Sequence, residues 1–113
     1  MPLKNIKFIS ISAVIILVSA VAQAEEFTVT QTNKTFMLNH VKVEKLTIKA
    51  GDSIKFLNED PWLHNIFSLS DLKTFDLGSY PQGQFKTVTF EKAGTADIEC
   101  AIHPGMLLKL EVK

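Results

Sequence analysis

Two segments near the C-terminus decide the fold: residues 96–100 read Ala-Asp-Ile-Glu-Cys, and residues 108–112 read Leu-Lys-Leu-Glu-Val. In both segments an apolar residue alternates with a charged one. Successive side chains of a β-strand point to opposite faces, so a period of two predicts a strand with one buried face and one face in water. The two segments therefore predict a pair of half-buried strands, joined by a short loop.

The same alternation extends over the rest of the chain. Further strands are predicted at 45–50, 53–56 and 87–90, with weaker candidates at 27–29 and 36–38. Residues 62–69 are apolar on both parities, so periodicity does not settle which face points inward. Turn signals separate the strands at 50–52, 58–61, 78–83 and 93–94, and no helical period persists over three turns. Seven or eight short strands separated by such turns indicate an all-β sandwich or barrel.

The N-terminus has the three parts of a secretory signal peptide. Lys4 and Lys7 precede an apolar run from Phe8 to Ala22, and Ala22-Gln23-Ala24 has small residues at the positions that a signal peptidase reads. The apolar run is shorter than the roughly 20 residues of a membrane span. We expect cleavage after Ala24, export and one domain over residues 25–113, without stable membrane insertion. An uncleaved N-terminal anchor is the alternative.

Charge limits the partners of this domain. Without Lys4 and Lys7, ten lysines stand against twelve acidic residues, so the net charge is −2, and the chain has no arginine. Nucleic-acid-binding domains carry basic patches, often with aromatic residues between the charges. This sequence has no such run, and a nucleic-acid partner is not expected.

The loop between the last two strands carries side chains that could bind a metal ion or react chemically. It reads Cys-Ala-Ile-His-Pro-Gly-Met over residues 100–106 and holds the only cysteine, which has no intrachain disulfide partner. Thiolate and thioether sulfur favour Cu(I), and imidazole serves both copper oxidation states. His64 is a candidate second imidazole. The residues alone leave open a free thiol, an intermolecular disulfide, a catalytic Cys–His pair and structural zinc, although zinc sites rarely include thioether.

These residues together resemble the cupredoxins, the small blue-copper proteins, and in particular the amicyanin-like proteins of methylamine-utilisation type. The Cys-x₂-His-x₂-Met spacing and the proline after the histidine are similar to that group. Residues 49–56 (KAGDSIKF), 58–60 (NED), 64–65 (HN), 75–78 (FDLG) and 80–83 (YPQG) extend the likeness over roughly residues 26–113. The resemblance implies a Greek-key β-sandwich.

The resemblance also implies a ligand set. His64, Cys100 and His103 would bind one type 1 copper ion, and Met106 would be the long axial ligand. The backbone amide of Asn65 would donate a hydrogen bond to the thiolate, and its side chain would tie the two ligand loops together. Pro104 restricts His103 to extended backbone angles and would stiffen the loop.

The implied function is a periplasmic carrier of single electrons, and not an enzyme. Three histidines in total cannot build the additional sites of a multicopper oxidase. The alternative is a carrier that delivers or sequesters copper without electron transfer to a partner. We expect a monomer with transient redox partners, a dehydrogenase or a cytochrome. The exposed edge would comprise His103, Pro104, Met106, Leu107, Pro61 and Trp62, and His40 is expected to be a surface histidine away from the site.

Overall fold

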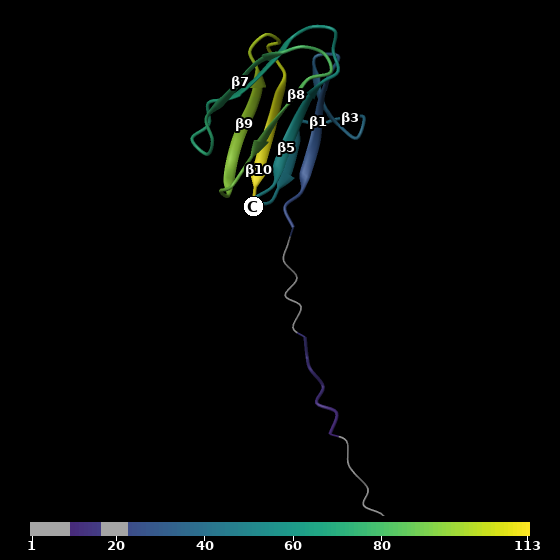
Figure 1. Ribbon diagram of the computed structural model, residues 1–113. Helices are drawn as coiled ribbons and strands as arrows, with labels where there is room; N and C mark the ends of the chain where they lie inside the picture. Colours follow the sequence, from purple (N-terminus) through teal and green to yellow (C-terminus); the bar gives the residue numbers. More distant parts are fainter. Residues whose placement is uncertain (1–9, 17–22) are drawn as a thin grey trace, which may run out of the picture.

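The computed structural model describes residues 10–16 and 23–113, and these residues form two five-stranded β-sheets (Figure 1). The first sheet has the strand order β3-β2-β1-β5-β8. Its strands are β1 (Glu26–Thr32), β2 (Thr35–Leu38), β3 (Val41–Lys42), β5 (Ser53–Asn58) and β8 (Phe85–Thr89). The two hairpins that join β1 to β2 and β2 to β3 turn over pairs of residues with positive φ, as tight two-residue hairpins require.

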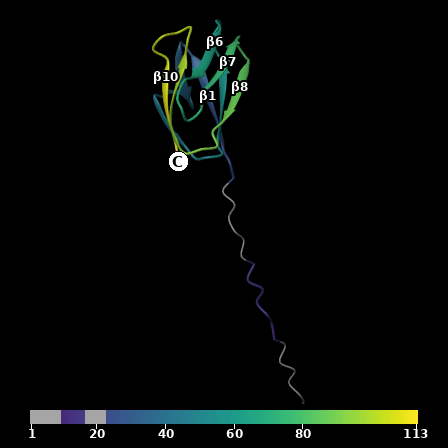
Figure 2. The same ribbon diagram turned by 90° about the vertical axis from the view of Figure 1, so that its left-hand side faces the viewer.

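The second sheet has the order β4-β10-β9-β6-β7 and carries the segments with the candidate ligands. Its strands are β4 (Lys45–Ile48), β6 (His64–Ser68), β7 (Phe75–Tyr80), β9 (Gly94–Cys100) and β10 (Leu107–Val112). Two pairs are parallel, β1 with β5 and β4 with β10, and the other pairs are antiparallel. The chain crosses repeatedly between the sheets. Figure 2 shows that the strands of both sheets are aligned along roughly the same axis. The predicted all-β sandwich is confirmed.

The core lies between the two sheets and follows the alternation of the sequence. Ala96, Ile98 and Cys100 of β9 are buried, while the charged residues between them are not. The β10 side chains Leu108, Leu110 and Val112 are buried in the same way. The other buried apolar residues are Val29, Phe36, Ile48, Ile54, Phe56, Ile66, Tyr80, Val88, Phe90 and Met106.

The described residues form ten strands, more than the seven or eight expected. One addition, β3, has only two residues and too little sequence for a period to show. The other, β7, includes Gly78, Ser79 and Tyr80, which the sequence predicted to be part of a turn. Its pairing with β6 contains a register shift between Asn65 and Phe67, so an irregular strand tolerates the glycine. The alternation of the sequence left the inward face of residues 62–69 open. In β6 it is the face of His64, Ile66 and Ser68, which are buried.

The predicted signal peptide, residues 1–24, lies largely outside the described residues. Of this segment, residues 10–16 and 23–24 have no regular secondary structure and are exposed. Among the residues that the structure describes, no helix is long and apolar enough to cross a membrane. Within the described part of the chain, every strand lies between Glu26 and Val112, so residues 10–16 and 23–24 are not part of either sheet.

Packing against the core should dominate stability. Leu110 is 2% exposed in the middle of β10, whereas Leu69 is 74% exposed after β6. We expect Leu110→Ala to lower the free energy of unfolding by about 3 kcal/mol, because the truncation leaves a cavity between the sheets. Leu69→Ala should change it by less than about 0.5 kcal/mol. Chemical denaturation measures both, and equal losses in the two variants would contradict this placement of the core.

Candidate metal centre

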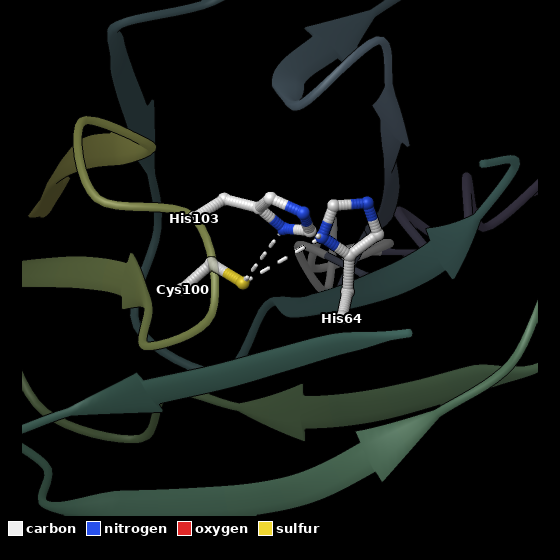
Figure 3. Close-up of side chains that lie close together, drawn as sticks. All are labelled: His64, Cys100 and His103. Atoms are coloured by element: carbon white, nitrogen blue, oxygen red, sulfur yellow. Dashed lines mark hydrogen bonds between the residues drawn. The ribbon is translucent and has the colours of Figure 1, made fainter. Parts of the chain in front are cut away.

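The pairing of β6 with β9 brings two distant side chains to the same end of the sandwich. His64 is the first residue of β6 and Cys100 is the last residue of β9. Ile66 pairs with Cys100 in the antiparallel register, so His64 projects just beyond the end of β9. His103 lies on the loop after Cys100 and turns back toward both residues (Figure 3). Sequence positions that are 36 residues apart thus contribute to one cluster.

The three donor atoms form a small triangle. Cys100 Sγ lies 3.5 Å from His64 Nδ1 and 3.7 Å from His103 Nδ1, and the two Nδ1 atoms are 3.2 Å apart. The point equidistant from the three atoms lies about 2.0 Å from each, close to the usual metal–imidazole bond length. Three Lewis-basic atoms at these separations fit one metal ion.

Backbone groups connect the two segments that carry the ligands. The amide nitrogen of Asn65 lies 3.4 Å from Cys100 Sγ and donates to it. The amide of Ala101 donates to the Asn65 carbonyl over 3.2 Å. The side-chain oxygen of Asn65 is buried and has no hydrogen-bond partner among the described residues. The connection between the ligand segments therefore runs through the backbone of Asn65, whereas the resemblance assigned it to the side chain.

A tight turn shapes the loop between Cys100 and Met106. The Met106 amide donates to the His103 carbonyl over 3.2 Å, with Pro104 and Gly105 at the central positions. Gly105 has a φ of 99°. Proline followed by a residue with positive φ is the pattern of a type II turn, which explains a glycine at this position. Met106 is only 4% exposed and packs in the core, so it does not belong to the exposed edge that the resemblance implied.

Asp60 is the functional residue that the sequence analysis missed. Its Oδ2 lies 2.7 Å from His64 Nε2, and both side chains are buried. The carboxylate accepts a hydrogen bond from Nε2–H, which leaves the unprotonated Nδ1 of His64, with its lone pair, facing Cys100. Asp60 also accepts hydrogen bonds from the backbone amides of Asn33 and Lys34 in the β1–β2 turn. An acidic residue four positions before the histidine was the available signal.

The surroundings of Asp60 and His103 lower the pKa of both groups. Burial raises the pKa of Asp60, but hydrogen bonds from Lys34, His64 and Asn33 outweigh that effect and hold its pKa below the ordinary value. The Asp60 carboxylate therefore stabilises the folded protein at neutral pH, and this stabilisation is lost as the pH falls through the lowered pKa of Asp60. Desolvation, with the nearby His64 and Lys34, lowers the pKa of His103. This shift favours the neutral imidazole of His103, which is the form that binds a metal.

The outer surface of the centre is largely apolar. The Trp62 ring lies 6.2 Å from the His103 ring, and the ammonium of Lys34 lies 5.1 Å from the Trp62 ring centroid. Leu63, Ile102 and Leu107 are neighbours of the candidate ligands in the chain and are 47%, 46% and 36% exposed. His40, in contrast, is exposed in the β2–β3 turn, as expected, and is not part of the cluster.

The donor set favours copper over zinc. A thiolate with two imidazoles and a buried thioether nearby in the chain is the combination of soft and borderline ligands that copper prefers. A structural zinc site would require a fourth thiolate, imidazole or carboxylate donor. The cluster of candidate donors in the described residues contains His64, Cys100 and His103, while the carboxylate of Asp60 is engaged with the far side of the His64 ring.

Removal of the Asp60 charge should weaken metal binding. We expect Asp60→Asn to lower the affinity for Cu(I) by about 10- to 100-fold, because a neutral amide oxygen accepts more weakly from His64 than a carboxylate does, and its NH₂ group cannot accept from the backbone amides of the β1–β2 turn. Competition with a chromophoric Cu(I) chelator measures this change. Glu59→Gln is the matched control, since Glu59 is the exposed neighbour and contacts Thr32 rather than a ligand. An unchanged affinity in Asp60→Asn would contradict the orienting role.

Comparisons with known proteins agree with this geometry. No protein-family model matches the chain. The methylamine utilization protein MauL of Methylorubrum extorquens is 30% identical over 94 residues, which cover 80% of this chain and 76% of MauL. The structures of two amicyanin mutants, one in the Cu(I) form and one reduced, each superpose with a TM-score of 0.68, at 23% and 24% identity, over 83% of this chain and 87% of theirs. The chain belongs to the amicyanin-like cupredoxins.

Proposed function

We propose that this chain is an exported blue-copper protein that carries single electrons between redox partners. One copper ion would be bound by His64, Cys100 and His103, with Met106 as the axial ligand. The observation that carries the proposal is the triangle of two imidazole nitrogens and one sulfur at the end of the sandwich. Copper in such a site supplies one-electron chemistry between Cu(I) and Cu(II).

The chain's own contribution is to hold the donors in place. His64 and Cys100 stand at the ends of paired strands, and the Pro104–Gly105 turn constrains His103. Asp60 and the Asn65 amide restrict the His64 ring and the Cys100 sulfur from the outside. Ligands on rigid elements with their own hydrogen bonds move little, which keeps the structural change on electron transfer small.

Electrons would enter and leave at His103. Its side chain is half-buried, whereas His64 is fully buried and Cys100 is 4% exposed. The apolar residues beside the ligands and the Lys34–Trp62 pair surround this opening. Small apolar surfaces of this kind suit the weak, dissociable encounters of electron carriers. We propose that the partners are a dehydrogenase and a cytochrome, and that the carrier acts in the periplasm after cleavage following Ala24.

A copper-delivery or sequestration protein is the competing function. It would use the same ligands but would release the metal readily. The buried His64–Asp60 pair and the core position of Met106 favour a retained ion. One donor cluster in the described part of the chain also favours a carrier over an enzyme.

The purified Cu(II) protein should show an intense visible band from thiolate-to-copper charge transfer. Cys100→Ser should abolish this band, because the serine oxygen cannot supply the sulfur orbital. His40→Ala, which removes an exposed histidine outside the cluster, should leave the spectrum unchanged. Absorption spectroscopy and cyclic voltammetry provide the measurement. Colourless Cu(I) binding with fast release would support the delivery protein instead.

Met106 should set the reduction potential. Loss of the thioether in Met106→Leu withdraws a donor that stabilises Cu(II), so the potential should rise. A tenfold weaker binding of Cu(II) relative to Cu(I) corresponds to a rise of about 59 mV. Met37→Leu is the matched control, because Met37 lies in β2 of the first sheet, whereas the candidate ligands belong to the second sheet and its loop. Voltammetry that gave the same potential for wild type and Met106→Leu would rule out axial ligation.

A further inference from the structure

Asp52 holds the first residue of the folded domain. Its Oδ1 accepts a hydrogen bond from the backbone nitrogen of Glu25 over 2.8 Å, and its Oδ2 accepts one from the amide of Lys49 over 2.8 Å. Asp52 is only 4% exposed. The hydrogen bond from the Glu25 amide has the largest effect on the Asp52 carboxyl, followed by the one from Lys49. Together they hold its pKa below the ordinary value. A nearly buried carboxylate thus receives the Glu25 nitrogen at a fixed position.

The fold places this nitrogen where the domain begins. The Glu25 carbonyl accepts a hydrogen bond from Ser53 over 2.9 Å, and Glu26 pairs with Ser53 at the start of the parallel β1–β5 ladder. Residues 23 and 24 are exposed and have no regular secondary structure. Among the described residues, Glu25 is thus the first that forms hydrogen bonds with the sandwich, and it directly follows the Ala22-Gln23-Ala24 cleavage signal.

We propose that Asp52 is the binding site for the α-ammonium group of Glu25, which removal of residues 1–24 creates. Hydrolysis of the Ala24–Glu25 peptide bond by a signal peptidase consumes one water. It leaves a carboxylate on Ala24 and a primary amine on Glu25, and this amine binds a proton at neutral pH. The neutral amide donor in the precursor becomes a cationic donor to the same carboxylate oxygen in the mature chain.

This change strengthens the contact without a change in fold. The carboxylate already makes a charge-assisted hydrogen bond with the amide, and an ammonium donor adds the attraction between two opposite charges. Glu25 itself is exposed, so water solvates the ammonium protons that do not face Asp52. The mature domain would thus gain stability from the cleavage itself.

The contribution can be isolated with two chains that differ by one residue. Residues 25–113 contain all ten strands, and residues 24–113 carry the charged amine one position further from Asp52. Both are released from a fusion by a protease that leaves no extra residue, and both are compared at the same copper loading. We expect the longer chain to melt about 4 °C lower, because it keeps only the neutral amide at Asp52.

A double-mutant cycle assigns the effect to Asp52. In Asp52→Asn, which removes the negative charge that attracts the ammonium group, most of the melting difference between the two chains should disappear. Asp71→Asn, which removes an exposed carboxylate in the turn after β6, should preserve the full difference. Equal melting temperatures for the two wild-type chains, or a difference that persists undiminished in Asp52→Asn, would overturn the proposal.

The full chain provides the second test. After expression of residues 1–113 with export, intact mass spectrometry of the periplasmic protein should give the mass of a chain that begins at Glu25. A different N-terminal residue would overturn the proposal, whatever the outcome of the copper measurements.

Discussion

The antiparallel pairing of β6 with β9 is the constraint on which the metal centre depends. It sets Ile66 opposite Cys100 and thereby places His64 beyond the end of β9. Because both strands lie inside the second sheet, with neighbours on each side, the relative position of the two side chains is supported by backbone hydrogen bonds along several strands. A shift of one residue in this register would turn His64 or Cys100 to the opposite face. The donor triangle exists only in the observed register.

Asp60 links this centre to the other sheet. Its carboxylate binds the His64 ring on one side and the amides of the β1–β2 turn on the other. The turn needs positive φ at Asn33 and Lys34, which directs both amides toward one acceptor. Asn58 completes the arrangement, because its side chain accepts from the Asp60 amide and donates to the Trp62 and Tyr80 carbonyls. The orientation of one copper-ligand candidate thus depends on contacts from both layers of the sandwich.

The division between buried and accessible groups follows from the loop after β9. The Pro104–Gly105 turn reverses the chain so that Met106 enters the core while His103 stays half-buried. Trp62 packs near the His103 ring and itself lies under the Lys34 ammonium, so the opening has an apolar rim with one positive charge. Of the three candidate donors, His103 is therefore the one with the most exposed side chain.

The sequence by itself determined the strands with clean alternation, the sandwich class and the spacing of Cys100, His103 and Met106, because period and ligand type are local properties. It could not reveal β3, which is too short, or β7, where Gly78 reads as a turn residue until its partner strand is known. Only the tertiary structure decided that Asp60 orients His64 and that Asp52 receives the Glu25 nitrogen. Both contacts join segments whose proximity arises from strand pairing between the elements, and no local pattern encodes that pairing.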